Sequence, residues 1–262
     1  MTDEHYMRMA LSLARRGAPW ACPNPLVGAV IVKDGRIIGK GYHRCCGENH
    51  AEINAIESAT EPVRGSTVYV TLEPCSHHGK TPPCVERLVQ ERPARVVIGT
   101  IDPNPAVSGR GLAALKRHGI ETRTGVLEDA CRDLNEVFFK YIRTRIPFVT
   151  LKFAQSIDGK IATATGHSRW ISSEPSRVYA HRLRSLHDAI LVGSGTIVKD
   201  DPELTCRLVK GRDPLRVVVD STLKIEPGAR VLQDQSRAGT VVFTSAAHDR
   251  KKKKRLADSG IE

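Results

Sequence analysis

His50-Ala51-Glu52 is followed along the chain by two Pro-Cys pairs, Pro74-Cys75 and Pro83-Cys84. Imidazole nitrogen and thiolate sulfur are ligands that zinc takes in tetrahedral sites. Three such ligands leave the fourth position of the metal open to water, and a nearby carboxylate can move protons there. The stretch therefore predicts a catalytic zinc site with His50, Cys75 and Cys84 as ligands and Glu52 as proton shuttle.

The residues around these ligands have the pattern of an α/β fold. We expect helices over 50–59 and 85–90 and a strand over 66–72, which ends just before Cys75. The partial positive charge of a helix N-terminus lowers the pKa of a thiol, so Cys84 is suited to bind metal as a thiolate. Folds of this class place their ligands at the carboxyl ends of the strands, where this site would lie.

Further elements predict one α/β layered domain over residues 1–145. Apolar residues at helical spacing predict a helix over 3–17. Asp34-Gly35 joins two apolar runs, 27–33 and 36–42, and is a strong signal for a β-hairpin. Downstream we expect a strand over 95–100, a helix over 112–118, a short strand over 120–124 and a helix over 127–141.

A second domain is expected over residues 146–262. Apolar runs predict strands over 148–154, 189–193, 215–220 and 240–244. Ser173 is suited to cap a helix over 175–187, because Glu174 and Pro175 favour its first turn. The chain reaches Glu262 directly after one more expected helix.

Composition and charge favour a cytoplasmic protein without a membrane or nucleic-acid partner. The seven cysteines are odd in number and no export signal precedes them, which favours reduced thiols. No apolar run approaches the roughly 18 residues of a membrane helix. The net charge is +11, but Arg250–Arg255 alone supplies six positive charges. Aromatic residues make up only 5%, a poor supply for base stacking.

Two other interpretations of the cysteines stay open at this point. A closed, structural zinc site would take His43, Cys45 or Cys46 as a fourth ligand. Alternatively, the cysteines bind no metal and are buried as packing residues, which we expect for Cys22, Cys131 and Cys206.

The spacing of the zinc cysteines resembles that of a particular family. Zinc nucleoside and nucleobase deaminases usually carry Pro-Cys-x-x-Cys, whereas here eight residues separate Cys75 from Cys84. This longer form, Thr71–Cys84, is similar to that of the riboflavin-biosynthesis deaminase–reductase family, RibD. Other stretches resemble the same family: Pro23-Asn24-Pro25-x-Val27-Gly28, Gly41-Tyr42-His43, Asp102-Pro103-Asn104-Pro105 and Gly109-Arg110-Gly111.

The resemblance implies a cytidine-deaminase-like, three-layer α/β/α first domain that holds one zinc ion. This domain would hydrolytically deaminate 2,5-diamino-6-(5-phosphoribosylamino)pyrimidin-4(3H)-one to 5-amino-6-(5-phosphoribosylamino)uracil. The positions that would line its substrate pocket are Asn24, His43, His77, Lys80, Asp102 and Asn104. From the residues alone, Asn24 also fits a rigid loop between two prolines, and His77 and Lys80 fit a solvated loop. Asp102 and Asn104 also fit Asx turns.

The resemblance continues into the second domain, through stretches such as 156–160, 168–171 and 195–205. It implies a dihydrofolate-reductase-like α/β domain that reduces the ribosyl group to ribityl with NADPH. The cofactor positions would be Ala154, Trp170, Thr196, Asp200 and Ser221, and the substrate positions Ser168, Arg184, Leu204 and Arg207. The reductase half of the family normally runs longer, so we expect this domain to be incomplete. The family also implies association into homo-oligomers.

Two alternative functions remain open. The basic charge would suit a deaminase that acts on cytidine or adenosine in nucleosides or nucleic acids. A basic binding protein with a structural zinc would instead need four protein ligands.

Overall fold

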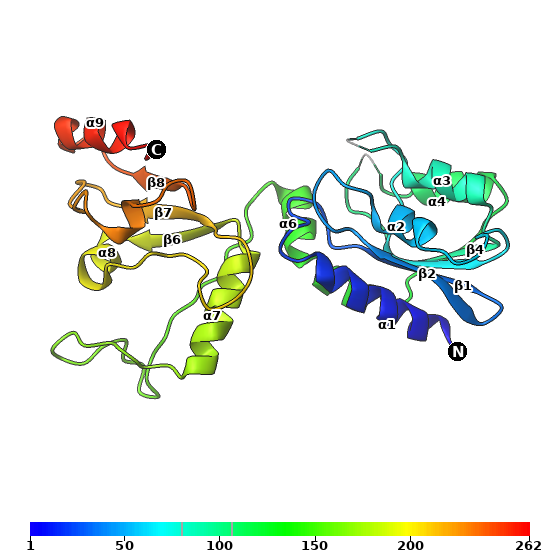
Figure 1. Cartoon of the computed structure of the whole chain (residues 1–262), viewed down its shortest axis with the longest axis horizontal. Helices are drawn as coiled ribbons and strands as arrows, with labels where there is room; N and C mark the ends of the chain where they lie inside the picture. The colour runs from blue at the N-terminus through cyan, green and yellow to red at the C-terminus, as the bar shows by residue number, and fades with distance from the viewer. Residues whose placement is uncertain (80, 106) are drawn as a thin grey trace. The chain divides into compact units, whose positions relative to one another are not determined.

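The computed structural model describes residues 1–79, 81–105 and 107–262. The chain divides into two compact units, Met1–Thr150 and Leu151–Glu262 (Figure 1). The expected α/β class is confirmed in both. The domain limits of 1–145 and 146–262 stay a prediction. No helix in the described part of the chain is both long and apolar enough to cross a membrane.

The first unit is built on a five-stranded sheet with the strand order β2-β1-β3-β4-β5. Its opening strands β1 and β2 form the predicted hairpin, and both residues of the turn, Asp34 and Gly35, have positive φ angles. β1 is antiparallel to β2 and β3, whereas β3, β4 and β5 are parallel. The bounds are β1 (Gly28–Lys33), β2 (Arg36–Tyr42), β3 (Thr67–Leu72), β4 (Arg95–Thr100) and β5 (Glu121–Thr124).

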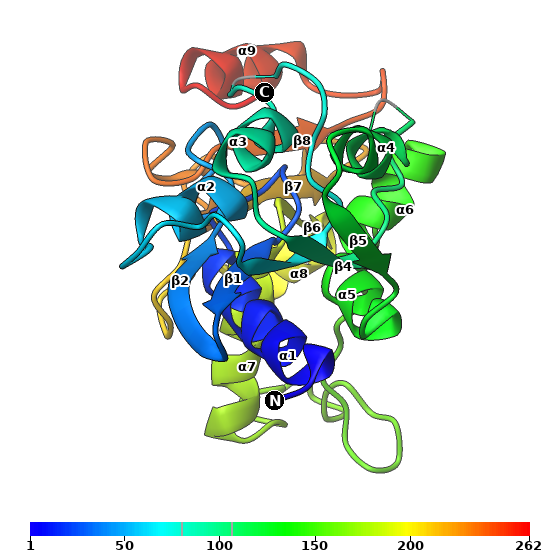
Figure 2. The ribbon, with the colours of Figure 1, turned by 90° about the vertical axis from the view of Figure 1, so that its right-hand side faces the viewer.

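Helices cover both faces of this sheet and make the predicted three layers (Figure 2). Ala29 and Ile31 of β1 point to one core, while Val30 and Val32 point to the other, as the two-residue period of a strand requires. The first core includes residues of α2 (Ala51–Glu57), α3 (Cys84–Glu91) and α4 (Arg110–Arg117). The second includes residues of α1 (Asp3–Ala14) and α5 (Glu128–Leu134); the short helix η1 (Arg15–Gly17) extends α1.

The single helix expected over 127–141 is wrong, because the chain forms two helices there. α5 ends at Leu134 and α6 (Glu136–Thr144) begins two residues later. Between them Asn135 has φ −115° and ψ 24°, outside the helical range. Its side chain bonds to the main chain of Leu26. A tertiary contact therefore interrupts a helix that the local pattern would continue.

The second unit contains a three-stranded parallel sheet with the order β6-β7-β8. Its core gathers Ile197, Val218, Ile225 and Leu256 with their neighbours. The strands are β6 (Ala189–Gly193), β7 (Leu215–Val219) and β8 (Thr240–Phe243). The helices are α7 (Glu174–Leu186), α8 (Ser194–Asp200), η2 (Arg230–Leu232) and α9 (Arg250–Asp258).

The strand expected over 148–154 is also wrong. This segment is irregular, and none of the described strands pairs with it. Leu151 is 82% exposed and Phe153 is 59% exposed. An apolar run predicts a buried strand only where a neighbouring strand is available to complete its hydrogen bonds.

A polar network around Asp3 fixes the N-terminus of α1 to the sheet. The Asp3 carboxylate accepts hydrogen bonds from Arg95 and from the Tyr69 hydroxyl, each at 3.0 Å, and one from Arg123 at 2.7 Å. Burial by itself would raise the pKa of Asp3, but the hydrogen bonds and charges of Arg95, Tyr69 and Arg123 outweigh it and lower the pKa. The network joins α1 to β3, β4 and β5.

Asp3→Asn is expected to lower the free energy of unfolding at pH 7 by about 1 to 2 kcal/mol, because it removes the charge from these bonds. A lowered folded-state pKa stabilises the fold above the unfolded pKa and stops doing so as the pH falls through the folded value. The difference in the free energy of unfolding between the wild type and Asp3→Asn should therefore shrink as the pH falls. Urea unfolding from pH 7 to pH 3 measures it. Glu4→Gln, which affects only the exposed pair with Arg8, is the matched control. An equal loss in both variants would contradict the assignment.

Candidate metal centre and active-site cavity

The structure brings the three predicted zinc ligands together. His50 immediately precedes α2, Cys84 is the first residue of α3, and Cys75 lies in the segment that leaves β3. The Nδ1 atom of His50 lies 3.5 Å from Sγ of Cys75 and 3.2 Å from Sγ of Cys84. The backbone N–H of Cys84 donates to Sγ of Cys75 at 3.3 Å. Two helix N-termini and one strand end therefore meet at one point.

The donor set fits zinc. One imidazole and two thiols lie with their ligand atoms all within 4.8 Å of one another, and zinc prefers these donor types. In the described part of the chain, neither His43, Cys45 nor Cys46 belongs to this group. The geometry therefore favours a three-ligand site over the closed site with a fourth protein ligand.

The protons of the site are distributed unevenly between the two thiols. The hydrogen bond between Cys84 and Cys75 lowers the pKa of the Cys75 thiol to about 4. The same hydrogen bond, together with burial, raises the pKa of Cys84. The surrounding residues alone therefore favour the thiolate at Cys75, and the expectation that Cys84 binds metal as a thiolate stays a prediction. The hydrogen bond to Cys75 also raises the pKa of His50, so this cluster attracts positive charge.

Glu52 lies beside the ligands and is almost completely buried, with 3% of its surface exposed. It is the second residue of α2, one turn or less from His50. Burial, and after it the negative charge of Cys75, raises the pKa of Glu52 to about 7. A carboxyl group with this pKa can both take and return a proton at neutral pH.

A cavity of about 330 Å³ opens onto these residues. His50, Glu52 and Cys75 are in its wall. Five of the six predicted deaminase substrate positions also line it, namely Asn24, His43, His77, Asp102 and Asn104; the sixth, Lys80, lies outside the described residues. The antiparallel arrangement of β1 and the parallel arrangement of β3 and β4 place these loops at one edge of the sheet.

Hydrogen bonds orient two of the lining side chains. Nδ1 of His43 lies 3.1 Å from the carbonyl oxygen of Asn49, and Nε2 lies 3.0 Å from Nδ2 of Asn24. Burial lowers the pKa of His43, so its ring is neutral at pH 7. Nδ1 then donates to Asn49, and Nε2 accepts from the Asn24 amide. The Asn24 carbonyl oxygen is thereby left to accept from a ligand.

On the opposite loop, Asp102 and Asn104 form an Asx turn in which the Asn104 N–H donates to the Asp102 carboxylate at 2.8 Å. Burial, with a smaller contribution from the charge of Glu73, raises the pKa of Asp102 to about 6. The two interpretations of Asp102 and Asn104, as an Asx turn and as part of the cavity wall, are therefore compatible with each other.

Glu73 and Phe138 are among the cavity residues that sequence reasoning missed. The Glu73 carboxylate accepts hydrogen bonds from the backbone N–H groups of Gly109 at 2.9 Å and Leu112 at 3.1 Å. Glu73 stands in the quoted Thr71–Cys84 stretch, two residues before Cys75, so a charged residue close to a predicted ligand was an available signal. Phe138 comes from α6, and nothing in its local sequence indicates a pocket.

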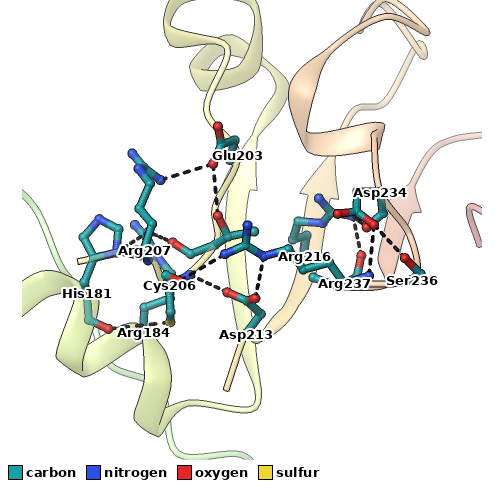
Figure 3. Close-up of polar contacts among 12 residues, drawn as sticks. His181, Arg184, Glu203, Cys206, Arg207, Asp213, Arg216, Asp234, Ser236 and Arg237 are labelled. Atoms are coloured by element: carbon teal, nitrogen blue, oxygen red, sulfur yellow. Dashed lines mark hydrogen bonds and ion pairs between the residues drawn. The ribbon is translucent and has the colours of Figure 1, made fainter. Parts of the chain in front are cut away.

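In the second unit, the predicted substrate positions Leu204 and Arg207 lie in the segment between α8 and β7, and Figure 3 shows Arg184 of α7 beside Arg207. Arg184 donates to the carbonyl oxygen of Thr205 at 2.6 Å, and the backbone N–H of Arg207 donates to Nδ1 of His181 at 3.2 Å. Leu204, between them in sequence, is buried. Burial lowers the pKa of Arg184. The guanidinium of Arg184 thus already donates a hydrogen bond to a main-chain carbonyl of the same unit.

The other predicted positions of this unit fall into two groups. Thr196 is near the start of α8, directly after β6, and Ser221 follows β7, so both lie at the carboxyl ends of parallel strands, whereas Asp200 is the last residue of α8. Ala154, Ser168 and Trp170 are in the irregular segment before α7. The Trp170 ring is 68% exposed and lies 4.5 Å from the Arg177 guanidinium. Arg169 donates to the carbonyl of Asp200 at 2.8 Å, which connects the two groups.

Cys75→Ser is expected to reduce bound zinc from about one ion per chain to nearly none, because it removes one of three ligands. Metal content after dialysis measures this. Cys45→Ser, a change outside the ligand group, should keep the zinc. Loss of zinc from Cys45→Ser would instead establish a closed site with four protein ligands.

Each of the two units matches a known protein family. Residues 1–100 match the family model described as the cytidine and deoxycytidylate deaminase zinc-binding region, and residues 147–261 match the RibD C-terminal domain. The riboflavin biosynthesis protein RibD of Aquifex aeolicus is 46% identical over 261 residues, which cover 99% of this chain and 72% of the relative. RibD of Bacillus amyloliquefaciens is 49% identical over 261 residues, 99% of this chain and 70% of the relative.

Solved structures show the same relationship. The diaminohydroxyphosphoribosylaminopyrimidine deaminase/5-amino-6-(5-phosphoribosylamino)uracil reductase of Thermotoga maritima is similar with a TM-score of 0.86 and 43% identity, over 99% of this chain and 79% of that one. RibD of Acinetobacter baumannii has a TM-score of 0.88 and 39% identity, over 99% and 72%. The chain therefore belongs to the RibD family of riboflavin-biosynthesis enzymes, which combine a zinc-binding deaminase domain with a reductase domain.

Proposed function

We propose that the cavity beside His50, Cys75 and Cys84 is the deaminase active site, and that its substrate is 2,5-diamino-6-(5-phosphoribosylamino)pyrimidin-4(3H)-one. One observation carries the proposal: two members of a three-ligand set, His50 and Cys75, and a buried carboxyl group line the same cavity as five predicted substrate residues. Hydrolysis at the 2-amino carbon forms a carbon–oxygen bond, breaks the carbon–nitrogen bond and releases ammonia.

The residues of the site would have three roles: binding the metal, transferring a proton and binding the substrate. His50, Cys75 and Cys84 would hold one zinc ion, which when bound supplies a nucleophilic water at neutral pH. A carboxylate oxygen of Glu52 takes a proton from the attacking water and returns it to the leaving amine, for which its pKa of about 7 is suited. The carbonyl oxygen of Asn24 accepts from the ring edge, while one N–H of its amide donates to Nε2 of His43. Asn24, His43, His77, Lys80, Asp102 and Asn104 are the proposed substrate positions.

For the second unit we propose reduction of the ribosyl group to ribityl with NADPH. Hydroxyl groups of Thr196 and Ser221 at the carboxyl ends of parallel strands fit a phosphorylated cofactor. The proposed cofactor positions are Ala154, Trp170, Thr196, Asp200 and Ser221, and the proposed substrate positions are Ser168, Arg184, Leu204 and Arg207. Self-association is proposed as well, since Leu191 and Phe243 leave apolar surface exposed on this unit.

The deaminase proposal predicts ammonia release from the diaminopyrimidine ribotide, and none from cytidine or from a single-stranded oligonucleotide. Glu52→Gln should lower this rate by about 1,000-fold or more, since a neutral amide cannot transfer the proton. Zinc content should stay at about one ion per chain, since Glu52 is not a ligand.

Two outcomes would contradict these roles. Ammonia from cytidine or the oligonucleotide but not from the ribotide would overturn the substrate and favour the alternative deaminase. Loss of zinc from Glu52→Gln would show that Glu52 is structural.

The reductase proposal predicts saturable binding of NADPH, measured by the change in its fluorescence on titration. Thr196→Ala should weaken this binding by about tenfold, because one hydrogen bond to the cofactor is lost. Ser259→Ala, at the end of α9, is the matched control and should bind normally. Equal affinity in both variants would remove Thr196 from the cofactor site.

A further inference from the structure

Asn135 connects two parts of the first unit that are 109 residues apart in sequence. Its Oδ1 accepts from the backbone N–H of Leu26 at 2.7 Å, and its Nδ2 donates to the Leu26 carbonyl at 2.9 Å. The side chain is buried, with 4% exposed. An asparagine that precedes a helix usually caps it through its side chain, but Asn135 makes no such bond to α6. The amide is used for Leu26 instead.

Leu26 lies in the segment that carries one wall of the cavity. Asn24, Pro25 and Val27 around it all line the cavity. The backbone N–H of Asn24 donates to Ala21 at 2.9 Å, and the carbonyl of Val27 accepts from His43 at 2.9 Å. Leu26 precedes the first residue of β1, so the sheet does not pair its two main-chain groups. Asn135 supplies a partner for both.

The other end of the connection carries a second wall. Phe138 lies three residues after Asn135, in the first turn of α6, and its ring contributes to the same cavity. The neighbouring Phe139 is buried and fixes this turn in the core. An aromatic face beside a cavity of about 330 Å³ suits a planar heterocycle. The two hydrogen bonds of the Asn135 amide therefore join the segment of one wall to the start of the helix that carries the other.

We propose that Asn135 is a positioning residue for the deamination. By joining Leu26 to α6, it fixes the distance between Asn24, which meets the polar edge of the pyrimidine ring, and Phe138, which meets its face. The inference rests on the proposed binding of the substrate in this cavity. Asn135 touches neither substrate nor metal in this scheme and acts only through the two walls.

The kinetic constants for ammonia release from the diaminopyrimidine ribotide test the proposal. Asn135→Ala is expected to raise KM about tenfold and to change kcat by less than about threefold, because the ligand set and Glu52 are untouched. Zinc content should stay unchanged. In an Asn24→Ala background, where one wall is already lost, the same substitution should raise KM less than about twofold further.

Ser58→Ala is the matched control. The Ser58 hydroxyl also pairs with both main-chain groups of one distant residue, accepting from Lys40 N–H at 2.9 Å and donating to Lys40 carbonyl at 2.8 Å. It is not in the cavity wall. Ser58→Ala should lower the melting temperature and leave KM unchanged.

The proposal is overturned if Asn135→Ala lowers only the melting temperature, as the control does, or if its effect on KM adds fully to that of Asn24→Ala. Should Asn135→Ala not fold, Asn135→Asp gives the same comparison, since it keeps the size and the acceptor and loses the donor to Leu26. If the wild type releases ammonia only from another pyrimidine, the proposed substrate fails, and the KM comparison is made with the pyrimidine accepted.

Discussion

The approach of two sulfur atoms to Nδ1 of His50 is the contact on which the first unit depends. It joins residues 25 and 34 positions apart in sequence, and so fixes the starts of α2 and α3 against the end of β3. A thiolate buried beside a carboxyl group is unfavourable without a positive partner. The hydrogen bond with Cys84 lowers the pKa of Cys75, the hydrogen bond with Cys75 raises the pKa of His50, and burial, with the charge of Cys75 after it, raises the pKa of Glu52. A bound divalent cation would supply this positive charge. The residues that would hold the metal are therefore the same residues that bring the starts of α2 and α3 to the end of β3.

The cavity around this contact is held together by side chains that bind main chain. The Glu73 carboxylate holds the loop that carries Asp102 through the N–H groups of Gly109 and Leu112. The Asn135 amide holds the segment that carries Asn24. In both cases a buried polar group is satisfied by backbone that lacks a partner in the sheet or helices, as burial requires. Side-chain hydrogen bonds to main chain therefore connect these walls to the rest of the unit, although the walls consist largely of loops.

The sequence was sufficient for features that depend on near neighbours or on a fixed spacing. The hairpin at Asp34-Gly35 follows from turn chemistry, and the ligands His50, Cys75 and Cys84 follow from donor type and position relative to helices and strands. The break at Asn135 and the cavity wall at Phe138 could not be predicted this way, because both depend on a contact with Leu26 that no local pattern encodes. The expected strand over 148–154 failed for a related reason: apolar content indicates the tendency to pair, while pairing itself needs a neighbouring strand.

The second unit shows why charge alone does not identify a binding residue. Arg216, the second residue of β7, is only 2% exposed, and its guanidinium donates to the carbonyls of Ala238 and Asp234 (Figure 3). Arg237 donates to the carbonyl of Cys206 and pairs with Asp213. Arg184 holds Thr205 in the same way. An arginine with several donors can satisfy main-chain carbonyls as well as a phosphate, and a sequence does not distinguish the two uses.

In the first unit, by contrast, titratable side chains converge on a cavity. Convergence of donors on an open volume, and not the number of charges, therefore distinguishes the deaminase centre from the arginine-rich loop.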